Sequence, residues 1–197
     1  MDRSEAAQVG VTDGADGLVA GLRRCDPQAH TELCTRYGRR VHRYLAGRLR
    51  GDADLAEDLL VQTLAETARN ISHFNPRRAT FTAWLFGIAR RQVQLELRRQ
   101  SRRKSVPLSA QVSLDAAAEV ATGDMAGASA ARMEAQRQVA LLRDCLSSTE
   151  MEALVLQHVY QLSIAEIGQV MGRSGRAIES LLHRAKTKAR ERLVNDA

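Results

Sequence analysis

The stretch "LSIAEIGQVMGRSGRAIESLLHRAK", residues 162–186, decides how the C-terminal part of the chain folds. It predicts two short helices around a tight turn. Ser163, followed three residues later by Glu166, has the pattern of a capping box that starts the first helix, and Gly172 is placed to end it. Ser174 can then cap the second helix, in which basic residues are crowded.

This pair of helices has the features of a helix-turn-helix. Such a unit needs a small residue where the helices cross, a glycine in the turn, and an apolar residue that anchors the second helix. Gly168, Gly172 and Ile178 meet these needs at matching separations. Ser147 with Glu150 makes another capping box, just before the pair. A plain helical hairpin is the alternative, but three matched positions and two capping boxes favour DNA binding.

The whole chain of 197 residues has the composition of a helical protein. Apolar residues make up 44% of it, which can support real cores, while aromatic residues make up only 4%. Helix formers dominate, and the runs of β-branched residues that strands need are absent. We therefore predict an all-α fold, with two small helical domains joined by a flexible linker.

The chain divides into four parts. Residues 1–17 carry three glycines and four acidic residues without apolar periodicity, which predicts a disordered acidic tail. Apolar residues then recur at helical spacing through residues 18–104, the first domain. Residues 105–134 are rich in Ala, Ser and Gly and are predicted to be the linker. Residues 135–197 form the second domain.

Three helix starts are expected between residues 26 and 80. Asp26-Pro27 places proline at the first position of one helix, Asp54 with Glu57 can cap the next, and Thr80 can cap another. The buried face of that last helix is predicted to consist of Phe81, Trp84, Leu85, Ile88 and Leu95. For its tryptophan, core packing is favoured over base stacking, because a lone aromatic residue at helical spacing is usually part of a core.

The positive charge of the chain is unevenly distributed. The formal net charge is +6, and the sequence pI is about 9.8. Residues 18–100 sum to +7, whereas residues 1–17 and 105–134 each sum to −3. Seven cations fall within the fifteen residues 90–104. A solvated helix end needs fewer, so this run favours contact with a polyanion.

Several functional classes are disfavoured by the sequence. The three cysteines, Cys25, Cys34 and Cys145, match no zinc pattern and, without a signal peptide, indicate a reducing cytoplasm. No apolar run approaches the length of a membrane span. No nucleophile–base pair, phosphate-binding loop or metal cluster is visible. We expect no catalytic residue, no cofactor, no metal and no membrane insertion.

Three segments together resemble the alternative sigma factors of bacterial RNA polymerase, of the compact extracytoplasmic-function (ECF) type. "AEDLLVQTL" (56–64) resembles the region 2 segment that docks on the polymerase clamp helices. "FNPRRATFTAWLFGIARRQVQLELRRQSRR" (74–103) resembles the segment that melts and reads the −10 element. The sequence from Leu146 to Leu193 resembles the region 4 helix-turn-helix that reads the −35 element.

The resemblance implies that the second helix of the helix-turn-helix lies in the major groove at the −35 element. The residues implied to bind DNA there are Arg173, Ser174, Arg176, Ala177, Glu179, Ser180 and Arg184. Arginines can reach phosphates or guanine edges, and serines can donate to either. Glu179 and Leu181 stand where the family commonly has Lys and Arg, so we expect an atypical −35 sequence. Leu181 is expected to meet a thymine methyl, or else to face inward or towards a partner.

The resemblance also implies a −10 surface around the loop 74–80, which should cradle an unstacked base. The residues implied to bind or melt DNA there are Asn75, Arg77, Arg78, Thr80, Arg90, Arg91, Arg98 and Arg99. The family often has Asn where Arg91 stands, which leaves the base preference open.

Core polymerase docking is implied for Asp54, Asp58, Leu59 and Gln62. An acidic surface repels DNA, so this face is expected to meet a protein of basic character, the polymerase clamp helices. Many family members have Gln and then Glu where this chain has Val61 and Gln62.

The function implied is that of a sigma factor that binds core RNA polymerase and promoter DNA, and that an anti-sigma factor holds inactive. The chain is expected to be cytoplasmic, associated with the nucleoid, and monomeric outside its complexes. The alternative is a LuxR-like regulator that binds DNA as a dimer. A helical adaptor is the weakest reading, because it leaves the charge blocks and both motifs unexplained.

Overall fold

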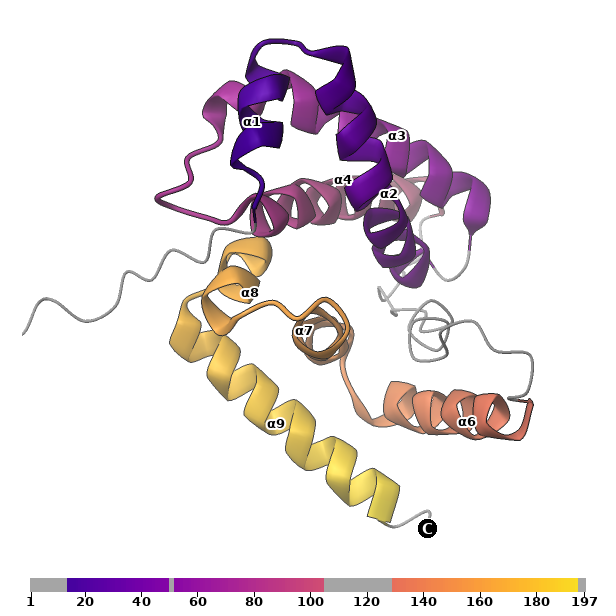
Figure 1. The fold of residues 1–197 in the computed structure, drawn as a ribbon. Coiled ribbons are helices and arrows are strands. Elements are labelled where there is room, and N and C mark those ends of the chain that lie inside the picture. Colours follow the sequence, from indigo (N-terminus) through magenta and orange to yellow (C-terminus); the bar gives the residue numbers. More distant parts are fainter. Residues whose placement is uncertain (1–13, 50–51, 105–128, 195–197) are drawn as a thin grey trace, which may run out of the picture.

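The computed structural model describes residues 14–49, 52–104 and 129–194, and within these ranges every regular element is a helix (Figure 1). The all-α prediction is confirmed. The elements are α1 (Asp16–Arg23), α2 (Pro27–Arg48), α3 (Ala53–Arg69), the short 3₁₀ helix η1 (Ile71–His73), α4 (Phe81–Lys104), α6 (Ser129–Cys145), α7 (Ser148–His158), α8 (Ile164–Met171) and α9 (Gly175–Val194).

The predicted tail and linker lie largely outside the described residues. The last residues of the predicted tail and the last residues of the predicted linker are described, and both are helical. Helix α1 begins at Asp16, because Leu18 and Leu22 of this helix are buried and tie it to the core. Helix α6 begins at Ser129, six residues before the predicted start of the second domain.

The first long helices begin as local capping rules require, with one correction. Pro27 is the first residue of α2, and the Asp26 carboxylate accepts a hydrogen bond of 2.9 Å from the Gln28 amide, as predicted. The cap of α3 is Asp52 and not Asp54, since Asp52 has the extended backbone that a cap requires and accepts from the Leu55 amide at 3.1 Å. Asp54 already lies in the first turn of the helix.

Helix α4 begins at its predicted cap, since the Thr80 hydroxyl accepts from the Ala83 amide at 3.2 Å. Phe81, Leu85 and Ile88 are buried as expected. The prediction for Leu95 is wrong, because 52% of this residue is exposed. Val93 is the buried residue in this turn, and a residue two positions along a helix points to nearly the opposite side.

The N-terminal core is built around a small aromatic cluster. The rings of Phe74 and Phe81 meet edge to face, with centroids 5.7 Å apart. Trp84 is half-buried and lies 5.3 Å from Phe74 and 5.9 Å from Phe81. Aromatic pairs at these distances stabilise a core beyond the area they bury. The core role predicted for Trp84 therefore agrees with its surroundings.

The described helices form an N-terminal body, α1 to α4, and a C-terminal body, α6 to α9. In the C-terminal body, the predicted caps and turn are confirmed. Both capping boxes form, at Ser147 with Glu150 and at Ser163 with Glu166. Gly172 ends α8 in the left-handed conformation, with φ of +65°. A Cβ atom on Gly168 would lie 2.7 Å from the backbone oxygen of Arg173, so only glycine lets the turn approach α8 this closely.

The two bodies pack against each other in this structure. Helix α8 lies against α4, while α9 runs away from the N-terminal helices (Figure 1). One hydrophobic cluster continues through both bodies, and Tyr160 joins it to Tyr44 and Phe86. The contact between them is therefore a packed interface with its own buried side chains.

Candidate nucleic-acid interface

Helix α9 presents a polar, basic side to solvent and an apolar side to the core. Ile178, Leu181 and Leu182 are buried and hold the helix against its neighbours. The predicted −35 residues lie on the other side of α9 or in the turn before it. Exposed residues are Arg173 and Ser174 in the turn and Arg176, Glu179, Ser180 and Arg184 on the helix, and Ala177 is half-buried. Such a side can offer guanidinium and hydroxyl groups to phosphates and base edges.

Two neighbouring positions add detail to this surface. Leu181 is only 4% exposed, so it faces inward and cannot contact a thymine methyl. His183 is exposed three residues after Ser180 and therefore lies on the same side of α9. Sequence reasoning missed His183, although its helical spacing could have identified it.

The loop before α4 is held in shape by its own side chains. Asn75 accepts a hydrogen bond of 2.9 Å from the Arg77 amide, which closes the turn. Arg77 and Arg78 are exposed beside it. Thr80 is half-buried, and besides capping α4 it donates to Glu166 of α8 at 2.5 Å. The loop therefore combines an ordered backbone with two solvent-facing cations.

The arginines of α4 have different surroundings. Arg90 is half-buried and its Nε lies 3.1 Å from a carboxylate oxygen of Glu152. Arg91 is exposed and ion-paired with Glu66 of α3. Arg98 and Arg99 are exposed farther along the helix, and Arg99 lies 3.6 Å from Glu96. Arg90 is thus held in the interior by a carboxylate, whereas Arg91, Arg98 and Arg99 are exposed.

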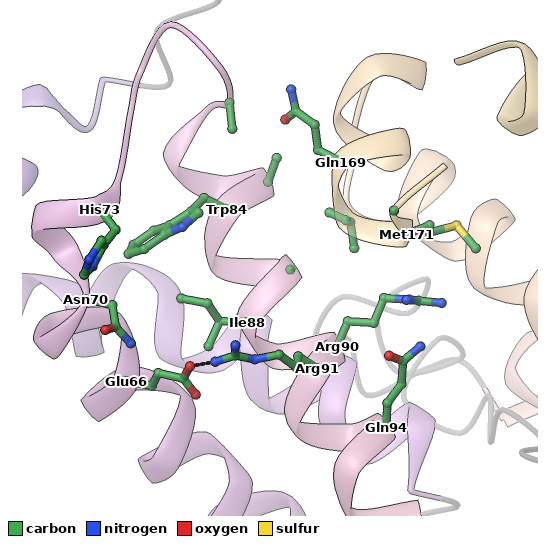
Figure 2. Close-up of a pocket in the computed structure, with 15 residues that line it drawn as sticks. Glu66, Asn70, His73, Trp84, Ile88, Arg90, Arg91, Gln94, Gln169 and Met171 are labelled. Atoms are coloured by element: carbon green, nitrogen blue, oxygen red, sulfur yellow. Dashed lines mark ion pairs between the residues drawn. The ribbon is translucent and has the colours of Figure 1, made fainter. Parts of the chain in front are cut away.

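A cleft of about 590 Å³ lies where α3, η1 and α4 face α8 (Figure 2). Trp84 and Ile88 contribute apolar surface, and Asn70, His73 and Gln94 contribute hydrogen-bonding groups. Across the cleft, α8 contributes Gln169 and Met171 (Figure 2). An aromatic surface beside amide and imidazole groups can hold an unstacked base.

The acidic face of α3 is available to solvent, with one correction. Asp54, Asp58 and Gln62 are exposed, and Val61 beside them is 67% exposed. Leu59 is 3% exposed because it packs into the core. It therefore supports this face from beneath and cannot itself contact a docked protein.

Cys25 and Cys34 are exposed, Cys145 is half-buried, and all three are free thiols. Within the described ranges, no group of three or more His, Cys, Asp or Glu side chains is placed to hold a metal ion. None of the described helices is both long and apolar enough to cross a membrane.

Comparison with protein families gives two matches in order along the chain. Residues 33–103 match the family described as Sigma-70 region 2, and residues 136–188 match Sigma-70, region 4. Together these matches cover more than half of the chain. The ECF RNA polymerase sigma factor BldN of Streptomyces coelicolor is 30% identical over 189 residues. That similarity covers 91% of this chain and 66% of BldN, so the chain spans just under two thirds of that relative.

Two solved structures share the fold. CnrH, in complex with the cytosolic domain of CnrY, has a TM-score of 0.62 and 23% sequence identity, over 91% of this chain and 97% of CnrH. The sigma factor RpoE, in complex with the anti-sigma factor NepR from Bartonella quintana, has a TM-score of 0.60 and 23% identity, over 85% of this chain and 97% of RpoE. At this identity the likeness concerns the arrangement of helices.

Proposed function

The chain belongs to the sigma-70 family, as an ECF-type sigma factor, and on that premise we propose that it directs core RNA polymerase to promoters with specific −35 and −10 elements. The observation that carries the proposal is the order of the two regions. A region 2 match precedes a region 4 match, and each falls on one of the two packed bodies. A dimeric regulator of the LuxR type has no use for the first of these regions.

In this proposal, α9 reads the −35 element. Its exposed side carries Arg176 and Arg184, and Arg173 lies in the turn before it. The buried residues of the same helix fix the direction in which these arginines point. Bidentate contacts to guanine and single contacts to phosphate are the chemistry expected of them.

The loop before α4 and the arginines of α4 then bind the −10 element. The exposed cations Arg77, Arg78, Arg98 and Arg99 supply phosphate contacts. The wall of the cleft that carries Trp84 and Asn70 accepts the base that leaves the stack. Removing a base from the stack costs a few kcal/mol, which aromatic contact and hydrogen bonds to the base edge offset.

The acidic face of α3 docks on the clamp helices of core polymerase. Asp54, Asp58 and Gln62 lie on a side of α3 that no described residue of the chain covers, since all three are exposed. A negative face complements a basic partner and steers its approach. The chain supplies promoter recognition and the polymerase supplies the bond chemistry.

An anti-sigma factor is proposed as a further partner. Both of these solved structures are complexes, one with the cytosolic domain of CnrY and one with the anti-sigma factor NepR. A protein of that kind that covers the α3 face would block docking on the polymerase. We also propose that residues 18–104 and 135–197 act as separate domains joined by 105–134, and that the chain works as a cytoplasmic monomer at the nucleoid.

Run-off transcription with purified core polymerase and a library of genomic promoter fragments tests the main proposal. We expect discrete start sites that depend on the chain and share −35 and −10 sequences. Asp58→Lys is the informative variant, because it reverses a charge on the exposed α3 face without touching α9. It should abolish transcription while leaving duplex binding by α9 unchanged. DNA binding without any chain-dependent transcript would contradict the proposal.

A further inference from the structure

A buried carboxylate from the C-terminal body joins the two bodies. Glu152 of α7 is 2% exposed. It accepts a hydrogen bond of 2.7 Å from the Tyr44 hydroxyl and one of 3.1 Å from Arg90 Nε, and it lies 3.6 Å from Arg48 Nη1. All three partners belong to the N-terminal body. The side chain of Glu152 therefore ties α7 to the N-terminal body.

This cluster is sensitive to small changes. Arg48 is 7% exposed and Tyr44 is 3% exposed, so neither can exchange Glu152 for water while the bodies stay packed. Burial, with the neighbouring Glu152 carboxylate, raises the pKa of Tyr44 well above its usual value, so the phenol remains a donor. A buried ion pair gains little net stability, because all its members can be hydrated again on separation, but removing one partner is costly. Removing Glu152 alone should therefore weaken the contact between the bodies.

Further contacts between the bodies lie around Glu152. Arg40 donates to the backbone oxygen of Tyr160 at 3.1 Å. The Tyr160 ring packs against Phe86 with centroids 4.8 Å apart. At the other end of the interface, Thr80 donates to Glu166, and the Gln169 side chain donates to the backbone oxygen of Arg78.

These contacts coincide with the proposed −10 surface. The side chains of Thr80 and Arg90 are engaged by residues of α8 and α7, and Arg78 is engaged through its backbone oxygen while its side chain stays exposed. Glu152 and Glu166 also place carboxylates against this surface, where they repel a DNA phosphate. By contrast, the exposed side of α9, with Arg176 and Arg184, faces solvent.

From this asymmetry we propose a latch: Glu152 holds a closed form in which the C-terminal body covers the part of the −10 surface around Thr80 and Arg90, while the −35 helix stays open. The free chain engages −35 DNA directly, but must separate its two bodies before −10 DNA can reach Thr80, Arg90 and the cleft beside them. This inference rests on the proposed function for the identity of the two DNA surfaces. The closed packing itself does not depend on it.

Glu152→Gln tests the latch in the full chain. Glutamine keeps the size and one acceptor for Tyr44 but leaves two guanidinium groups without a counter-charge. Glu191→Gln is the matched control, since it removes the same charge from an exposed position on α9. Gln169→Ala is a second variant at an exposed residue, which weakens the same interface without risk to either core.

Two readouts separate the parts of the proposal. Small-angle X-ray scattering should show a larger radius of gyration for Glu152→Gln than for the wild type and Glu191→Gln. Fluorescence anisotropy should show affinity for a single-stranded −10 oligonucleotide rising about tenfold for Glu152→Gln and less for Gln169→Ala, with −35 duplex affinity unchanged.

The outcomes are distinguishable from failure of the proposed function. An unchanged radius of gyration for both Glu152→Gln and Gln169→Ala overturns the latch, even where run-off transcription succeeds. A larger radius of gyration without a gain in affinity for the −10 oligonucleotide would contradict the claim that the closed form covers the −10 surface. Expansion in a chain that directs no transcription leaves the latch standing and removes the proposed function instead.

Discussion

Helices α9 and α4 are both rich in arginine, yet they expose it differently. On α9, Arg176 and Arg184 are exposed and form no ion pair within the described residues. On α4, Arg90 is paired with Glu152 and Arg91 with Glu66. The exposed arginines of α9 are thus free to contact a polyanion. At Arg90 and Arg91, helix α4 must exchange protein carboxylates for phosphates, so binding there depends on how the rest of the molecule is arranged.

The largest effect is expected from Gly168→Val, which should disrupt the turn that positions α9. The added side chain meets the backbone oxygen of Arg173, which cannot move without reshaping the turn. We expect a loss of about 3 kcal/mol in the stability of the C-terminal body. Urea unfolding followed by circular dichroism measures it.

The control for that substitution is Gly38→Ala in the middle of α2. A Cβ atom there meets nothing within 4 Å. Alanine should therefore stabilise the chain by about 1 kcal/mol, because glycine is a poorer helix former. Equal destabilisation by both substitutions would contradict a specific close approach at Gly168.

Arg176→Ala should weaken binding to a −35 duplex by about 2 kcal/mol, if this arginine contacts a base edge, and relax sequence preference at one position. Arg190→Ala removes the same charge about 21 Å farther along α9. It should lower affinity only slightly and for all sequences alike. Anisotropy titrations at two salt concentrations measure the DNA affinity of both variants. Equal losses of affinity would show that α9 binds DNA only through non-specific charge.

Glu66→Gln should sharpen the α4 side by releasing Arg91 from its ion pair. Arg91 is exposed, so the gain is modest, about threefold in affinity of the holoenzyme for a single-stranded −10 oligonucleotide. Glu96→Gln removes an equal charge from beside Arg99, at the longer separation of 3.6 Å. A gain as large for Glu96→Gln would show that net charge, and not Arg91, is responsible.

The smallest effect is expected from pH, through Glu150 of the C-terminal body. Burial alone would raise the pKa of Glu150, but hydrogen bonds from Lys188 and Ser147 outweigh it and lower the pKa below the usual value of 4.5. The resulting stability is present above that usual value and is lost as pH falls through the lower folded value. Lys188→Met should therefore destabilise the chain at pH 7 and have less effect at pH 3. Thermal unfolding at the two pH values measures this; a pH-independent difference would contradict it.

Local patterns in the sequence were sufficient for most of the C-terminal body. Ser147, Ser163 and Ser174 cap their helices as predicted, and Gly172 takes the left-handed conformation. Each of these features depends on residues three or four positions apart, so the sequence contains both partners side by side. Where two carboxylates competed for one cap, at Asp52 and Asp54, sequence spacing alone chose the wrong one.

Only the tertiary structure decided which basic residues are available. Glu152 meets Arg90 across 62 positions of sequence and Tyr44 across 108. Leu59, expected on the docking face, is buried, and Leu95, expected in the core, is exposed. Burial follows from what packs on each side of a helix. Helix starts and turns follow from near neighbours and can be read along the chain. Ion pairs and buried faces follow from the packing of distant segments, which no local pattern contains.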